Sequence, residues 1–197
     1  MERKHILRDF KLYTVIIILA AITVMAADFN DAPYDKEGDA SEANKLMNKL
    51  EGSYSKHFNN ALVDGSEYKS EDTMEFVKVT DTTAYINLHT EFYNGHECNV
   101  NGIVEYKKVG GFVYQDRDTT LDACLLTIKL DGSKIKFSDP EGNCHKFCGA
   151  RGGFSGDAFT LRQKKQITSK ELKKLRKSDR YQNAVKIYRE ERHLSQL

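Results

Sequence analysis

The chain has 197 residues, 30% of them charged, and a formal charge of +1 at pH 7. This length suits one domain with one core, and the near-neutral charge lacks the field that attracts nucleic acid. We therefore expect no nucleic-acid partner.

The first segment predicts export. Four basic residues within the first eleven precede an apolar run over 12–27, and small residues follow at Ala26 and Ala27. The run is shorter than the ~20 apolar residues of a spanning helix, so we interpret residues 1–26 as a cleaved signal peptide. A retained signal anchor is the alternative. Cleavage leaves a formal charge of −1, a periplasmic or secreted chain, and no stable membrane span.

The next segments change from leader to helix. Residues 27–40 are acidic and rich in turn formers, which indicates a flexible leader. Residues 41–52 follow, with Ser41 as a candidate N-cap and apolar residues on one helical face (Leu46, Met47 and Leu50). This pattern predicts a short helix against the main body.

From residue 53 to about 161 the apolar residues recur with the period of two that is typical of strands. Residues 83–92 show it most clearly, with Ile86, Leu88 and Phe92 expected to face inward. Gly110-Gly111 and Asp131-Gly132 predict hairpin turns. The expected strands number seven or eight and lie at 53–58, 73–79, 83–92, 98–109, 111–116, 123–130, 133–139 and 158–163.

No long helical pattern interrupts these strands, which excludes parallel βαβ units. We therefore predict a mainly β fold, a small antiparallel barrel over residues 41–166, with a two-sheet sandwich as the alternative. Sequential hairpins favour the barrel, because they form an up-and-down sheet directly.

Residues 167–197 return to helical spacing. Thr168 or Ser169 would cap a first helix, and Ser178 or Asp179 a second. The apolar residues lie on one stripe (Leu172, Leu175, Tyr181, Val185 and Tyr188). We predict a helix pair docked on the barrel; the alternative is a basic amphipathic helix that binds a membrane or a partner.

The four cysteines predict two disulfides, because an even number in an exported chain favours disulfides over zinc. Three pairings are possible. Cys98 lies at the open end of the hairpin that turns at Gly110-Gly111, so its cross-strand neighbours are expected near residues 121–124. The predicted pairs are therefore Cys98–Cys124 and Cys144–Cys148.

The sequence contains no clear catalytic motif. The glycines of residues 149–156 do not have the spacing of a nucleotide-binding loop, and Ser155 lacks the setting of a nucleophile elbow. Disulfides would also remove any cysteine nucleophile. We therefore predict no catalytic residue, no enzyme activity and no cofactor.

Histidines are the candidate metal ligands. His89 and Glu91 share one strand face, His96 follows closely, and His145 could approach from another loop. The sequence has neither an HxH nor an HExxH motif, so we predict no metal site.

Two loops are candidate binding surfaces. Residues 93–96 form a predicted Asn-Gly turn with Asn94 and His96, and residues 144–156 carry Arg151 and Ser155. Disulfides would make both loops rigid, which lowers the entropy cost of binding. We name Arg151, His96, Asn94 and Ser155 as binding residues; alternatively, Arg151 only braces its loop.

Several short blocks carry a family resemblance: "LEGSY", "DGSEY", "EFYNGHEC", "FVY" and "CHKFCGARGGFSG". Over residues 48–188 the chain resembles an uncharacterised family of exported bacterial proteins grouped near the LprI-type lysozyme-inhibitor-like proteins. The resemblance implies a periplasmic β-domain that blocks a lytic enzyme by inserting a loop. "GGFSGDAF" is similar to the Ser-Gly-rich loop of membrane-bound inhibitors of c-type lysozyme, and "LEGSY" to the start of lipocalin-like barrels. No inhibitory residue can be carried over.

The sequence therefore predicts an exported, non-enzymatic binding protein of the bacterial envelope, lysozyme-inhibitor-like in its most specific form. Its partner would be a lytic enzyme or a small ligand in the barrel. One alternative is a small metal-dependent hydrolase on a β scaffold. Another is a structural envelope protein that recruits a partner through its helical tail. An open barrel cavity would indicate ligand carriage, and a filled core would indicate recognition at the surface.

Overall fold

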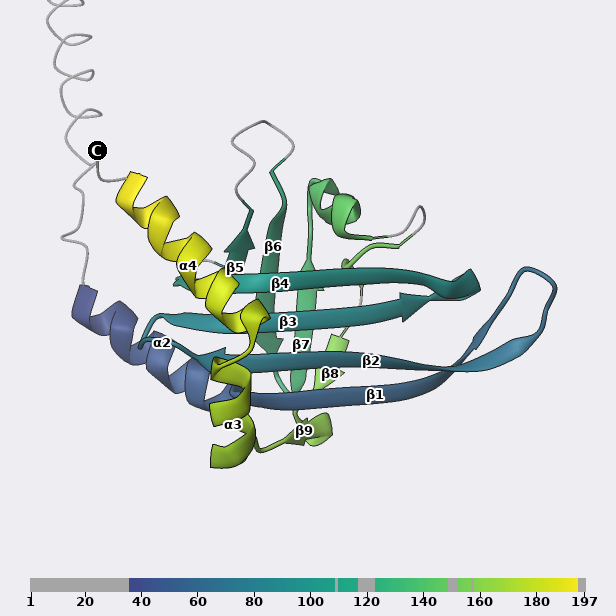
Figure 1. Cartoon of the computed structure of the whole chain (residues 1–197), viewed down its shortest axis with the longest axis horizontal. Coiled ribbons are helices and arrows are strands. Elements are labelled where there is room, and N and C mark those ends of the chain that lie inside the picture. The colour runs from purple at the N-terminus through teal and green to yellow at the C-terminus, as the bar shows by residue number, and fades with distance from the viewer. Residues whose placement is uncertain (1–35, 109, 117–122, 149–151, 157, 195–197) are drawn as a thin grey trace, which may run out of the picture. The chain divides into compact units, whose positions relative to one another are not determined.

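A computed structural model describes residues 36–108, 110–116, 123–148, 152–156 and 158–194 (Figure 1). The predicted signal peptide, residues 1–26, and Arg151 lie outside these described residues.

The first described element is helix α2 (Lys36–Leu50). It begins five residues before Ser41, so residues 36–40 are helical and the prediction of a leader is wrong for them. Met47 and Leu50 are fully buried in the interior cluster of the sheet. The helix thus buries the apolar face that its sequence predicts.

The strands form one antiparallel sheet in the order β8-β7-β6-β5-β4-β3-β2-β1-β9. Because neighbours in sequence are neighbours in the sheet, the expected up-and-down arrangement is confirmed. The described strands are β1 (Gly52–Ala61), β2 (Glu67–Lys78), β3 (Thr83–Phe92), β4 (His96–Lys107), β5 (Gly111–Gln115), β6 (Leu125–Asp131), β7 (Lys134–Ser138), β8 (Ala158–Thr160) and β9 (Lys164–Lys165).

The sheet curves into a nearly closed barrel, which confirms the predicted fold class. The turn η3 (Leu161–Gln163) carries the chain from β8 at one edge to β9 at the other. Across the closing edges, the rings of Tyr54 on β1 and Phe159 on β8 lie 5.9 Å apart. The described strands number nine rather than seven or eight, because the two-residue β9 was not predicted.

The interior of the barrel is occupied by side chains. On β3, Ile86 and Leu88 are fully buried as predicted, whereas Phe92 at the strand end is only half-buried. The largest buried side chains of this cluster include Phe76, Phe112, Phe154, Phe159, Met74 and Leu126. Each such side chain stabilises the fold by roughly 1.5–3 kcal/mol through burial.

A second apolar cluster lies on the outer face of the sheet, beneath α3 (Ser169–Arg176) and α4 (Asp179–Leu194). Tyr181 of α4 is buried, and its ring lies 5.0 Å from that of Tyr85 on β3. Thr168 caps α3: Glu171 N donates to Thr168 Oγ1 at 3.3 Å, and Thr168 N donates to Glu171 Oε2 at 2.8 Å. The predicted docked helix pair is confirmed.

Two disulfides are present, as predicted, but their pairing was predicted wrongly. The bonds join Cys98 to Cys148 and Cys124 to Cys144. The prediction extended the β4–β5 hairpin as far as Cys98, whereas that ladder ends at the pair Val104–Tyr114. Beyond this pair Cys98 forms an isolated bridge with Cys148 instead.

Within the described residues, no helix combines the length and the apolar character that crossing a membrane requires.

Candidate functional site

The candidate site lies at a corner of the sheet, where β4 and β5 stop pairing. These strands pair only from Val104 to Lys107 and from Gly111 to Tyr114. In Figure 1, β1 to β4 run across the direction of β5 to β8. The part of β4 before Val104 therefore diverges from β5, and α4 packs over β4 on the outside.

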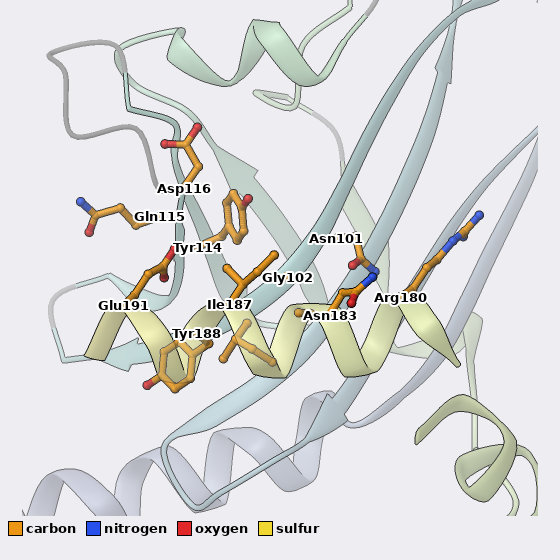
Figure 2. A pocket seen from close by; sticks show the side chains of 12 residues that line it. Asn101, Gly102, Tyr114, Gln115, Asp116, Arg180, Asn183, Ile187, Tyr188 and Glu191 are labelled. Atoms are coloured by element: carbon orange, nitrogen blue, oxygen red, sulfur yellow. The ribbon is translucent and has the colours of Figure 1, made fainter. Parts of the chain in front are cut away.

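A cleft of about 470 Å³ lies between this corner and α4 (Figure 2). Its volume is in the range of small-molecule binding sites. The lining comes from β4, the β5 end and one face of α4: Asn101, Gly102, Ile103, Tyr114, Gln115, Asp116, Arg180, Asn183, Ala184, Ile187, Tyr188 and Glu191.

Gly102 and Tyr114 form the apolar base of the cleft. A Cβ atom on Gly102 would lie 2.4 Å from Cε2 of Tyr114, so only glycine lets the ring lie against β4. The same ring makes a T-shaped contact with the ring of Phe147, with the two ring centroids 6.0 Å apart. Burial, followed by the charges of Asp116 and Glu191, raises the pKa of Tyr114 to about 12. Its hydroxyl therefore stays neutral.

The far wall, α4, is fixed to the sheet near both ends of the cleft. The rings of Tyr181 and Tyr85 pack against each other at a tilt near one end, and near the other the Tyr188 hydroxyl donates to Glu105 Oε1. Arg192 Nη1 in turn donates to the Tyr188 hydroxyl at 3.2 Å. Burial acts to raise the pKa of Glu105, but hydrogen bonds from Lys107 and Tyr188 outweigh it and lower that pKa. The carboxylate therefore stays ionised and holds the helix.

Several polar groups face the cleft without a partner in the described part of the chain. The side chains of Arg180, Asn183 and Gln115 make no hydrogen bond or ion pair there, and neither does the Tyr114 hydroxyl. Asn101 uses its Nδ2 group, which donates to the Tyr85 hydroxyl at 2.5 Å, and keeps its carbonyl oxygen. These donors and acceptors are available to a ligand.

The two ends of the cleft differ in charge. Arg180 lies at one end, and Glu191 and Asp116 lie at the other, as Figure 2 shows. Asp116 is held in place, because its Oδ2 pairs with Lys146 Nζ at 2.6 Å and its Oδ1 accepts from Cys124 N at 3.1 Å.

The predicted binding residues lie elsewhere. Asn94, in the turn η1 (Tyr93–Gly95), has the expected positive φ, 63°, and its Oδ1 accepts from Val63 N at 3.3 Å. His96 begins β4 opposite Phe92. Asn94 thus braces a turn, and neither residue lines the cleft.

Ser155 also has a bracing contact. Its hydroxyl accepts from Asp139 N at 2.9 Å, and it does not line the cleft. A Cβ on Gly152 would lie 2.8 Å from Sγ of Cys98 and 3.4 Å from Phe92. The disulfide therefore holds this loop beside the 93–96 turn, although Arg151 itself is outside the described residues.

The candidate metal ligands are separated. His89 Nε2 lies 3.4 Å from Glu91 Oε1 and its Nδ1 lies 2.9 Å from Asn99 Oδ1, whereas His145 Nδ1 contacts Gly142 O at 2.7 Å. Within the described ranges, no three His, Cys, Asp or Glu side chains are placed to hold a metal ion.

The cleft was not predicted from the sequence, because its residues come from three separate segments. One signal was present: Gly102 interrupts the strand pattern "NVNGIVEY", and a glycine inside a strand often marks a close approach. Ile187 was another, as an apolar residue outside the predicted stripe of the C-terminal helices, and the structure leaves it 40% exposed.

Comparison of the chain with protein-family models, with curated protein sequences and with solved structures gives no match. The function therefore has to be inferred from the residues themselves.

Proposed function

We propose that the chain is an exported, non-enzymatic binding protein of the bacterial envelope, with the cleft between α4 and the β4–β5 corner as its recognition site. One observation carries the proposal. Amide groups, a guanidinium group and a tyrosine hydroxyl without partners in the described chain converge on a concave surface with apolar walls. Sites that hold small ligands have this composition.

Export is supported by the cysteines together with the predicted signal peptide. Both pairs form disulfides, and such bonds persist in oxidising compartments such as the periplasm.

A binding role fits this chemistry better than catalysis does. The amides of Asn101, Asn183 and Gln115 and the guanidinium group of Arg180 orient ligands through hydrogen bonds, but they do not transfer protons at ordinary pH. Of the two carboxylates in the lining, Asp116 is held by Lys146 and by Cys124 N. The pair best suited to proton transfer, His89 and Glu91, lies on the outer face of β3 and does not line the cleft.

The filled barrel interior also supports recognition at the surface. Buried aromatic and aliphatic side chains occupy the place where a carrier barrel would hold its ligand. A ligand would therefore bind at the corner between β4 and β5.

A pair of tryptophan substitutions on α4 tests the proposal. Asn183 and Gln182 are both exposed neutral amides, but only Asn183 lines the cleft. The purified protein, residues 27–197, is screened by NMR against peptidoglycan fragments, short peptides and lytic enzymes. We expect Asn183→Trp to abolish binding of a hit and Gln182→Trp to keep it. A hit that binds both variants equally well would place the recognition site elsewhere.

Lysozyme inhibition is the most specific form of the proposal and depends on the family resemblance. Its test is the activity of c-type lysozyme and of bacterial lytic enzymes with the purified protein at micromolar concentration. We expect inhibition that Asn183→Trp weakens. Full activity of every enzyme would remove this form and leave the binding role intact.

A further inference from the structure

The cleft has the charge pattern of a dipolar ligand. A guanidinium group, that of Arg180, lies at one end, and the carboxylates of Glu191 and Asp116 lie at the other (Figure 2). Tyr114 lies near the second end, where burial first and then these two charges raise the pKa of its hydroxyl. A ligand with an anionic group at one end and a cationic group at the other would match both ends.

The length of the cleft follows from α4. Arg180 and Glu191 are eleven positions apart on one helix, which at about 1.5 Å per residue separates their Cα atoms by roughly 16 Å along the axis. An extended polypeptide advances about 3.3 Å per residue, so about five residues cover this distance.

The middle of the cleft suits a peptide. Asn101, Asn183 and Gln115 offer amide donors and acceptors, which complement the N–H and C=O groups of an extended chain. Between them, Ile187 extends from α4 towards the ring of Tyr114, so apolar surface is present for a side chain. Backbone-like polar groups beside an apolar surface recur in peptide-binding sites.

We infer that the cleft binds a short, extended peptide with free termini, its carboxylate at Arg180 and its ammonium group near Glu191. This inference rests on the proposed function of the cleft. Arg180 can hold a carboxylate through two parallel hydrogen bonds.

Other ligand classes fit less well. A phosphorylated ligand would meet one arginine, and the Glu191 carboxylate would repel it, whereas the charge of Asp116 is offset by Lys146. A neutral sugar could use the amides but would leave the opposite charges of the two ends unused.

The probe is the pentapeptide Gly-Leu-Val-Leu-Gly in four forms: free, C-terminally amidated, N-terminally acetylated, and blocked at both ends. Isothermal titration calorimetry measures its binding to the protein of residues 27–197. We expect amidation to weaken binding about tenfold, because it removes a charge-assisted hydrogen bond to Arg180. We expect acetylation to weaken binding by several-fold, because it removes an ion pair with the partly exposed Glu191 carboxylate.

Variants assign each effect to its residue. In Arg180→Ala the free and amidated peptides should bind equally, and in Glu191→Gln the effect of acetylation should shrink. Arg189→Ala is the matched control, since Arg189 is an exposed arginine of the same helix outside the cleft, and it should keep the tenfold difference.

Equal binding of all four peptides to the unchanged protein would overturn the inference. Binding of none of the four peptides would also overturn it. In that case the proposed function would still stand if Asn183→Trp abolished the binding of another ligand. Peptide binding that Asn183→Trp does not change would count against both.

Discussion

The disulfide pairing makes the most decisive prediction. Replacing Cys98 and Cys148 by alanine should lower the free energy of unfolding by about 4 kcal/mol, because the bond closes a loop with a sequence separation of 50. Replacing Cys124 and Cys144 should cost about 3 kcal/mol, since that separation is 20. Urea denaturation measures both losses, with the unchanged oxidised protein as reference.

Counting free thiols in the same variants tests the pairing itself. The Cys98/Cys148 double variant should contain no free thiol, because Cys124 and Cys144 remain bonded. A Cys98/Cys124 double variant should contain two, one from each broken bond. The reverse result would refute the pairing. A loss below about 1 kcal/mol in the Cys98/Cys148 variant would refute the loop-closure reasoning.

Three further outcomes are expected. Gly102→Ala should destabilise the fold by about 1–3 kcal/mol in urea denaturation, because its Cβ would overlap the ring of Tyr114. Thr168→Ala should cost about 1 kcal/mol by the same measurement, because the N-cap of α3 is lost. His89 should titrate above 6.5 in an NMR pH series, because hydrogen bonds and nearby carboxylates outweigh the effect of burial, and Glu97→Gln should lower its pKa. Protonation of His89 therefore adds to the free energy of unfolding. This contribution is fully present below pH 6.5 and is lost as the pH rises through the pKa of His89 in the folded protein.

Each of these outcomes has a control. Gly153→Ala should be nearly neutral, because no atom lies within 4 Å of its Cβ position. An equal cost at both glycines would contradict the overlap argument. Ser169→Ala should spare α3, since Thr168 is the cap, and equal losses would show that the capping box does not contribute. A pKa of His89 at or below 6.5 would contradict the balance of effects assigned to it.

Local features of the fold could be predicted well from the sequence. The strand Thr83–Phe92 has the predicted bounds, because its period-two pattern is long and one face is buried. The cap of α3 could be narrowed to Thr168 or Ser169, and Thr168 is the one that forms the capping box with Glu171. The turn after β6 centres on Gly132, whose φ of 59° shows why glycine stands there.

Features that depend on the path of the sheet could not be predicted. The prediction extended the β4–β5 ladder beyond the pair Val104–Tyr114, which placed Cys98 opposite the wrong cysteine. The same divergence opens the cleft, so one missed corner accounts for both the wrong disulfides and the missed site. Only the relative positions of α4 and this corner bring Arg180 and Tyr114 to one surface.

The closure of the sheet also has a consequence for aggregation. Strand edges with unpaired backbone groups recruit other chains into aggregates. Here β9 pairs with Ser53 and Tyr54 at the start of β1. Further along β1, Lys56 directs its ammonium group inward, 2.5 Å from the buried Asp72 carboxylate. A strand from another chain that paired here would have to displace the Lys56 ammonium group. We therefore expect the edge of β1 to resist aggregation.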